Sequence, residues 1–340
     1  MQKRTEISFA SIVLCLLVMF IHISSQPVSA LNRDSVQFLT VLFPWRLSAF
    51  VVQGFIFLSS LKYFLRPPIT DYRSFYLGRI KTIFLPYVLW TVIYYFFFYF
   101  AGYYSLSLAD FCHYLLLGNI VSPFYFIIII LQFYALMPLW QKLFRSFDPI
   151  VLLALSFAIT VLFPQSLPPF LAKFGITLSY TDRMFPTYLL YWVLGGVCGL
   201  REERIKQFWK KRAFLLVTLC AAFGILDLYY TYQTYVFGVS VPFLETLHIF
   251  YCVFAIFAVM CVGIYVSEGK WMRLAPYTFT AYLSHCLFLN LINFFMQAIG
   301  ITDIGLSYFL RFVFVYLATL FFCFLLQTCK QRLFQKKGAQ

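Results

Sequence analysis

The chain has 340 residues, of which 62% are hydrophobic, 22% aromatic and only 11% charged. Soluble domains usually contain about 45–50% apolar and about 25% charged residues, so this composition excludes a soluble enzyme, a disordered chain and a secreted disulfide scaffold. The 26 basic residues outnumber the 12 acidic ones, for a formal net charge of +14. In so apolar a chain this excess indicates Lys and Arg facing anionic lipid rather than nucleic acid. The composition predicts an all-α polytopic membrane protein.

Ten apolar runs can supply membrane-spanning helices, which need about 20 residues to cross a bilayer. The runs cover residues 7–25, 41–61, 83–101, 124–140, 150–164, 184–200, 213–230, 243–266, 276–298 and 305–328. The fifth run is short and lies between Pro149 and Pro164, which indicates a bent or partial span. No internal repeat or long linker is visible, so we predict one integral membrane domain over residues 1–340.

The basic residues predict how these spans are oriented. With both termini in the cytoplasm, every Lys and Arg falls at the cytoplasmic side except Arg33, Arg46, Lys173, Arg183 and Arg311. Cytoplasmic loops are enriched in Lys and Arg. The distribution therefore favours ten transmembrane helices with the N- and C-termini cytoplasmic.

The first apolar run also has features of a signal peptide. Lys3 and Arg4 precede it, and Val28–Ala30 resembles a cleavage site. The run is long for a signal peptide and carries His22, for which a discarded segment has no use. A retained first span is the favoured interpretation.

The nine cysteines show no CxxC or zinc-type spacing, and most lie inside apolar runs. Cysteine in such a run behaves as a small hydrophobic residue. We therefore expect no disulfide bond and no metal. We also expect no bound cofactor.

Two ionisable residues are expected at similar depth in the membrane. His22 lies near the outer end of the first span, and Arg46 lies a few residues inside the outer end of the second. Ionisable groups at this depth often mark functional sites, and a neutral imidazole can accept a proton from a hydroxyl. An interfacial histidine with an arginine reaching outward is the alternative, and the residues alone leave both open.

Further polar residues lie within the late spans. His285 is near the middle of its span beside Tyr282 and Ser284, where either catalysis or hydrogen bonding between helices explains it.

The outer ends of the last four spans carry three more polar features. Glu245 and His248 share a helix face and read as an interfacial polar pair, with Asp227 on the same side of the membrane. For Arg311, the expected partner is Asp303 or Asp227.

Neutral polar and small residues inside spans read as packing features. Gln132 and the Ser59-Ser60 pair suit hydrogen bonds between helices, and Gly195 and Gly199 are spaced for close helix contact.

Three basic residues, Arg73, Arg79 and Lys81, precede Pro86 at the predicted inner face. They are either ordinary cytoplasmic anchors or a site for a phosphate-bearing cytosolic ligand, because arginine binds phosphate through two parallel hydrogen bonds.

Five segments together carry a resemblance to a known family. They are residues 6–22, 53–59, 74–87, 117–138 and 277–288. In order and spacing they resemble the membrane-bound acyltransferase 3 family over most of the chain. The resemblance implies that His22, at the end of the first helix, is catalytic. It also places Arg79 and Lys81 in the family's basic stretch before Pro86, and His285 in a late Tyr-Leu-x-His element.

The family resemblance further implies transfer of an acetyl or succinyl group from cytosolic acyl-CoA, a co-substrate. The acceptor would be a hydroxyl of a cell-surface or exported glycan, and the location a bacterial cell membrane. The overall pattern is most similar to the intercellular-adhesion C-like branch, which is associated with acylating exported poly-N-acetylglucosamine.

Two positions depart from the family pattern. The family usually has an arginine where this chain has Ser11, and a glycine where it has Ser60. Either Arg46 replaces the missing charge and stabilises the developing oxyanion, or the chain belongs to a divergent branch.

Two other kinds of membrane protein compete with an acyltransferase. A polysaccharide exporter or small-solute transporter would be indicated by paired broken helices in repeated halves, which we do not see. A glycan polymerase would be expected to carry a large basic outer loop, whereas residues 102–123 contain no Lys or Arg. A scaffold role is the interpretation if Ser11 signals lost catalysis.

Overall fold

The computed structural model describes residues 4–337, with side chains through Cys329. Lys3 and the side chains of four predicted cytoplasmic residues lie outside this described part: Lys330, Arg332, Lys336 and Lys337. Residues 4–337 form helices joined by turns and contain no strand. The chain is therefore an all-α polytopic membrane protein, as the composition predicts.

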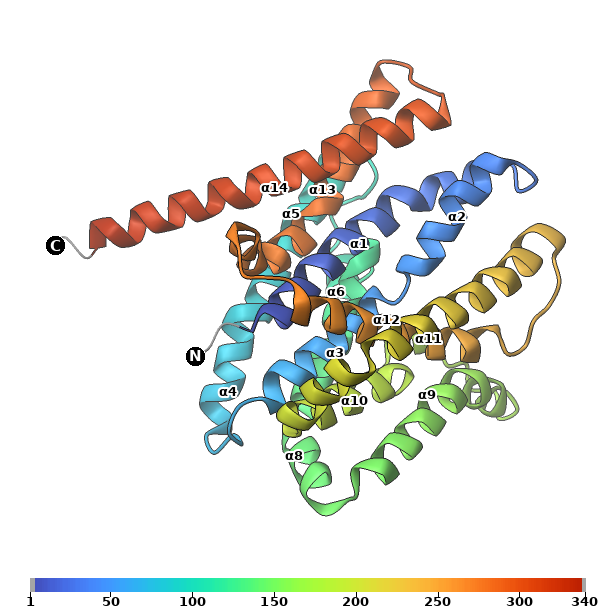
Figure 1. Cartoon of the computed structure of the whole chain (residues 1–340). Coiled ribbons are helices and arrows are strands. Elements are labelled where there is room, and N and C mark those ends of the chain that lie inside the picture. The colour runs from blue at the N-terminus through green and yellow to red at the C-terminus, as the bar shows by residue number, and fades with distance from the viewer. Residues whose placement is uncertain (1–3, 338–340) are drawn as a thin grey trace. The chain divides into compact units, whose positions relative to one another are not determined.

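The chain divides into two compact units (Figure 1). The terminal unit comprises Met1–Val51 and Val217–Gln340, and the central unit comprises Val52–Leu216. Helix α11, Glu202–Phe237, contributes its first part to the central unit and its second part to the terminal unit.

The other elements of the terminal unit are six helical segments. They are α1 (Thr5–Ala30), α2 (Val36–Ser48), α12 (Leu244–Tyr265), the 3₁₀ segment η5 (Lys270–Tyr277), α13 (Thr278–Ala298) and α14 (Ile304–Lys337).

The central unit holds the remaining helices. They are α3 (Val51–Phe64), α4 (Tyr72–Arg79), the π-helical segment η1 (Ile80–Phe84), α5 (Leu85–Phe100), α6 (Leu108–Leu117), η2 (Ser122–Phe124), α7 (Tyr125–Ala135), α8 (Met137–Ser146), α9 (Pro149–Ala172), η3 (Thr181–Arg183), η4 (Phe185–Tyr188) and α10 (Leu189–Leu200).

Helix α1 is the core helix of the terminal unit. It packs against α2, α12, α13 and α14, and Leu14, Met19 and Ile23 are almost fully buried along it. Gly263 of α12 allows close approach, because a Cβ there would lie 2.8 Å from the Cα of Glu6. Residues on α1 are thus held between several helices at once.

Small and aromatic residues determine the packing of the central unit. A Cβ at Gly199 of α10 would lie 2.9 Å from Cβ of Phe64, and one at Gly195 would collide with the carbonyl of Phe57. Ser60 Oγ donates to the carbonyl of Trp192 at 2.6 Å. The packing roles predicted for these positions are confirmed, and Gln132 likewise bonds the backbone of η3 and η4.

Eight helices in the described part are long and apolar enough to cross a membrane. A ninth span results if α6 and η2–α7, which meet at a bend of 60°, count together. The apolar segment Phe185–Leu200 is shorter than the others. All ten predicted apolar runs are helical, but two of them lack the length of a simple span.

Helix α9 differs from its prediction. It runs from Pro149 to Ala172 and continues through Pro164, Pro168 and Pro169, so the prediction of a short run ending near Pro164 is wrong. Proline is tolerated in membrane-type helices because neighbouring groups can satisfy the carbonyls it leaves free. Pro149 itself suits the first turn, where no N–H is needed.

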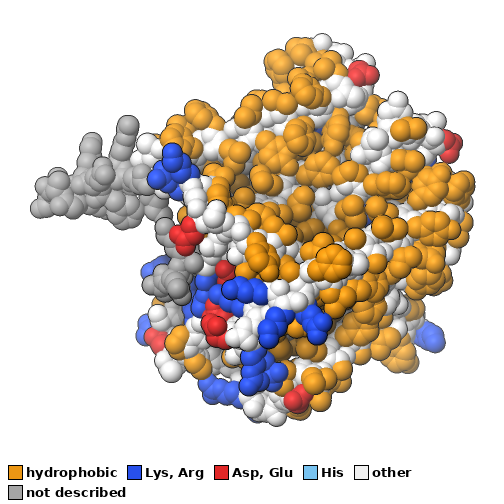
Figure 2. All heavy atoms as spheres, in the orientation of Figure 1, with side chains coloured by type: hydrophobic (Ala, Val, Ile, Leu, Met, Phe, Trp, Pro, Cys, Tyr) orange, Lys and Arg blue, Asp and Glu red, His pale blue; other side chains and the backbone are white. Residues whose placement is uncertain are grey.

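Hydrophobic side chains cover most of the face shown in Figure 2, while charged side chains of both signs gather toward its lower left and stand singly elsewhere. Phe214, Phe309 and Leu317 are among many large apolar side chains that are more than half exposed. Such a surface suits lipid rather than water.

Candidate functional site

The two histidines expected to be functional lie together in the terminal unit. His22 of α1 and His285 of α13 have ring centroids 5.3 Å apart with planes inclined by 37°. His285 is fully buried. The residues are 263 positions apart and meet because α1 and α13 pack side by side.

The hydrogen bonds of His285 determine which of its nitrogens is available. Nδ1 lies 3.1 Å from the carbonyl of Ala281, and a carbonyl only accepts, so Nδ1 carries the proton. In the neutral ring Nε2 is then the acceptor, and it lies 3.4 Å from Sγ of Cys286. His285 is thereby held in one orientation beside His22.

Ser11, which replaces the family's arginine, is accommodated within α1. It is buried, and its Oγ donates to the carbonyl of Ile7 at 2.8 Å. This hydroxyl is satisfied within its own helix, and α1 therefore carries no charge at the position of the family's arginine.

Arg46 lies in a buried ionic network. Its Nε and one terminal nitrogen each donate to the carboxylate of Asp227 at 2.9 Å. Asp227 is fully buried, and Nδ1 of His248 lies 3.1 Å from its Oδ2. Glu245, 3.6 Å from Arg46, is 69% exposed at the edge of the network.

This network changes the interpretation of Arg46. The sequence placed Arg46 beside His22, but the guanidinium lies against Asp227 and the histidine near it is His248. Two of its N–H groups are already used, which suits an ion pair joining α2, α11 and α12. His248 is correspondingly buried and hydrogen-bonded to Asp227.

A second buried arginine, Arg311, bonds the two helices that carry the histidine pair. Arg311 of α14 donates through Nε to Oδ1 of Asn293 at 2.6 Å and through a terminal nitrogen to Oε1 of Gln26. Gln26 is one helical turn beyond His22 on α1. The expected partners Asp303 and Asp227 are wrong, because amides on the helices packed against α14 reach the guanidinium instead.

The sequence contains an indication of this cluster of Arg311, Gln26 and Asn293 that our sequence analysis did not use. Gln26 is spaced four residues from His22, and such residues share one helix face. Asn293 lies eight residues after His285, a spacing that also returns to the same face of α13. Residue spacing within each helix does not show that α1, α13 and α14 pack together, so it could not predict this cluster.

The predicted phosphate-binding residues lie in the central unit. The guanidinium of Arg79 lies 5.2 Å from the ring centroids of both Phe75 and Tyr134, and its Nε is buried without a hydrogen-bond partner in the described part. Lys81 and Arg73 are exposed. Arg79 is thus oriented by aromatic rings and keeps a donor unused.

The backbone is unusual at this point as well. Lys81 lies in the π-helical segment Ile80–Phe84, between α4 and Pro86 at the start of α5. π-Helical turns are rare and often occur at functional sites.

The structure thus brings the predicted site residues together in three separate groups. His22 joins His285, Arg46 joins Asp227 and His248, and the basic residues around Arg79 follow one another in the central unit. Within the described residues no cluster of three or more His, Cys, Asp or Glu could hold a metal ion, so we assign no metal ligands.

Comparison with known proteins identifies the family. A family model described as an acyltransferase domain, that of the acyltransferase 3 family, matches residues 6–328. No curated protein and no solved structure is significantly similar to the chain. The match begins at α1, which carries His22, and extends through α13, which carries His285, into α14. The chain therefore belongs to the acyltransferase 3 family and is a multi-pass membrane acyltransferase.

Proposed function

We propose that this protein transfers an acyl group from cytosolic acyl-CoA to a hydroxyl of an exported or cell-surface glycan at a bacterial plasma membrane. The observation that carries the proposal is the pair of His22 and His285, with rings 5.3 Å apart inside the helices of a membrane acyltransferase. A neutral imidazole is the common base for activating a hydroxyl.

In the proposed reaction, the glycan hydroxyl attacks the carbonyl carbon of the thioester. One histidine of the pair accepts the hydroxyl proton as the new C–O bond forms. The C–S bond then breaks, and the leaving thiolate takes up that proton, so that the histidine is returned to its neutral form. The second histidine orients the first, and His22 is our choice for the base because Nδ1 of His285 is held by Ala281.

Arg79, Lys81 and Arg73 are proposed to attract the phosphates of the donor. The unused Nε of Arg79 supports this role, because guanidinium groups bind phosphate with charge-assisted hydrogen bonds. Arg46 was the first candidate for stabilising the oxyanion. Its bidentate bond to Asp227 now favours a supporting role.

Arg311 supplies another buried positive charge near the histidine pair. It is held by the amides of Gln26 and Asn293, and no ion pair among the described residues neutralises its charge. We place it on the acceptor side of the site, where such a charge would favour a developing oxyanion.

The experiment measures O-acyl esters on surface glycans. A strain lacking the protein is complemented with wild type, His22→Ala, His285→Ala or His113→Ala at matched membrane levels. His113 is the control, because it is exposed on α6. We expect esters with wild type and His113→Ala, and a transfer rate lower by about 10²–10⁴ for His22→Ala.

Two outcomes would contradict the proposal. Full ester content with His22→Ala would remove the histidine pair from the mechanism. Unchanged esters in the strain without the protein, with glycan retained inside the cell, would indicate export and would end the glycan-acylation proposal.

A further inference from the structure

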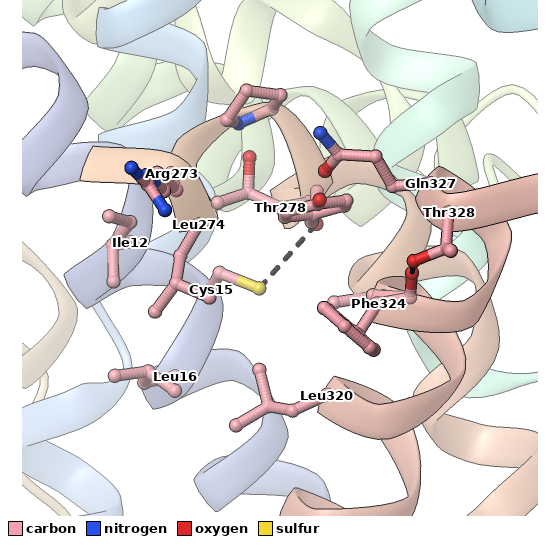
Figure 3. Close-up of a pocket in the computed structure, with 14 residues that line it drawn as sticks. Ile12, Cys15, Leu16, Arg273, Leu274, Thr278, Leu320, Phe324, Gln327 and Thr328 are labelled. Carbon is pink, nitrogen blue, oxygen red and sulfur yellow. Dashed lines mark hydrogen bonds between the residues drawn. The ribbon is translucent and has the colours of Figure 1, made fainter. Parts of the chain in front are cut away.

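A cavity of about 650 Å³ lies within the terminal unit, between α1, η5, α13 and α14 (Figure 3). Its size is within the range of about 300–1,000 Å³ that small-molecule sites usually have. Cys15 lies in its wall, where Sγ is 3.5 Å from the carbonyl of Thr278. No residue of this cavity belongs to the site predicted from the sequence.

The two ends of the cavity differ in chemistry. Arg273 and Gln327 lie toward one end in Figure 3, and Leu16 and Leu320 toward the other. Such a cavity suits an elongated molecule with a charged end and an apolar end.

Two of the polar groups are available to a ligand. Arg273 is exposed and forms no ion pair with the described residues. Oε1 of Gln327 is buried and has no hydrogen-bond partner in the described part. A buried acceptor without a partner costs free energy, so a ligand that donates an N–H would satisfy it.

The apolar end of the cavity points toward the histidine pair. Leu16 is six residues before His22 on α1, about 9 Å along the helix axis. Ala281, which lines the cavity, is one turn before His285 on α13. Helix α14 runs antiparallel to α1, since Tyr316 bonds the carbonyl of Leu16 and Arg311 bonds Gln26.

We propose that this cavity binds the acyl donor as the thioester of a phosphorylated pantetheine arm, with phosphate at Arg273, an amide N–H at Gln327 and the acyl group toward His22. The proposal rests on the proposed function. It adds Arg273 and Gln327 as donor-binding residues. Coenzyme A and an acyl carrier protein both carry this arm, so the test includes both.

The ligand class follows from the order of the groups along the cavity. A phosphate needs a cation, which Arg273 supplies with planar donors. An amide N–H needs an acceptor, which Gln327 supplies. A short acyl group needs an apolar wall near the base, which Leu16 and Leu320 supply. A simple hydrocarbon would leave the first two groups unused.

The test measures equilibrium binding to the purified full-length chain in detergent micelles. The ligands are acetyl-coenzyme A, S-acetylpantetheine, which lacks phosphate, and an acetylated acyl carrier protein. Arg273→Gln should weaken acetyl-coenzyme A by about tenfold and leave S-acetylpantetheine unchanged. Gln327→Leu should weaken both small thioesters by the same factor of about five.

Matched controls come from the same unit. Arg33→Gln removes an exposed arginine that donates a hydrogen bond to the carbonyl of Tyr235, and Gln297→Leu changes an exposed glutamine of α13. Both should bind the three ligands as wild type does. Because S-acetylpantetheine is measured on the same Arg273→Gln sample, it also reports whether that variant is folded.

Several results would overturn the inference. If Arg79→Gln weakens acetyl-coenzyme A while Arg273→Gln and Gln327→Leu do not, the donor binds elsewhere and the proposed function stands. If wild type binds none of the three thioesters, the proposed donor and the cavity assignment both fail. If wild type retains a phospholipid that Arg273→Gln loses, with thioester binding unchanged, the cavity is a lipid site.

Discussion

At the scale of single residues, the surroundings of each ionisable group separate structural roles from chemical ones. Asp227 has no exposed surface, and both of its oxygens accept hydrogen bonds from Arg46. His285 instead keeps its Nε2 free of any carboxylate and lies beside His22. The first arrangement neutralises charge, whereas the second holds His285 beside His22, the proposed base.

Removing the carboxylate of Asp227 tests this distinction. Asp227→Asn leaves the buried Arg46 with only the largely exposed carboxylate of Glu245 as a counter-charge, so we expect a loss of about 3–5 kcal/mol of stability. Thermal unfolding of the purified variant in micelles measures this loss of stability. The double variant Arg46→Gln with Asp227→Asn should recover a large part of the lost stability.

Acyl transfer by the double variant separates the two roles of Arg46. Recovery of both stability and transfer indicates that the ion pair only holds the helices. Stability without transfer would show instead that Arg46 acts in the chemistry, contrary to our assignment.

At the scale of elements, the contact between α10 and α3 depends on glycine. Gly195 and Gly199 lie on one face of α10, where α3 approaches too closely for a side chain. The close approach also allows Ser60 to bond the carbonyl of Trp192. Packing of this kind replaces the hydrophobic effect, which is weak between helices in lipid.

A single methyl group should disturb this contact. Gly195→Ala places a Cβ against the carbonyl of Phe57, and forcing the helices apart should cost about 1–3 kcal/mol in thermal unfolding. Gly78→Ala is the matched control, because a Cβ there has nothing within 4 Å. Equal thermal unfolding midpoints for the two variants would mean that α3 and α10 can move apart without loss of stability.

At the scale of the whole molecule, the orientation in the membrane is the main prediction. The distribution of Lys and Arg predicts cytoplasmic termini and places residues 102–123 outside. The described helices include eight clear spans, a bent pair and the shorter Phe185–Leu200. The parity of the spans therefore depends on whether both of these irregular segments cross the bilayer.

Two exposed cysteines can test the orientation. Cys112 is in α6, within the predicted outer loop, and Cys329 is near the predicted cytoplasmic end of α14; both are exposed. In variants that retain one of the two and have every other cysteine replaced by serine or alanine, a membrane-impermeant maleimide added to intact cells should label Cys112 only. Permeabilised cells should label both, which controls for reactivity. Labelling of Cys329 from outside would reverse the predicted orientation.

Much of the fold could be predicted from the sequence, because long apolar runs in a membrane protein have few alternatives to helices. The predictions failed where one residue was taken to decide a boundary. Pro164 was read as the end of a helix, but α9 continues past it to Ala172. Such a boundary depends on neighbours that can satisfy free carbonyls, which local sequence does not specify.

The sequence by itself determined the class of protein, the family and the helices that carry His22, Arg79 and His285, because composition and local spacing are sufficient for each. Only the tertiary structure decided which ionisable groups meet. His22 faces His285 rather than Arg46, Arg46 neutralises Asp227, and Arg311 bonds two amides. The physical reason is that a helix presents its polar residues to whichever helix packs against that face. That choice depends on contacts between residues up to 300 positions apart.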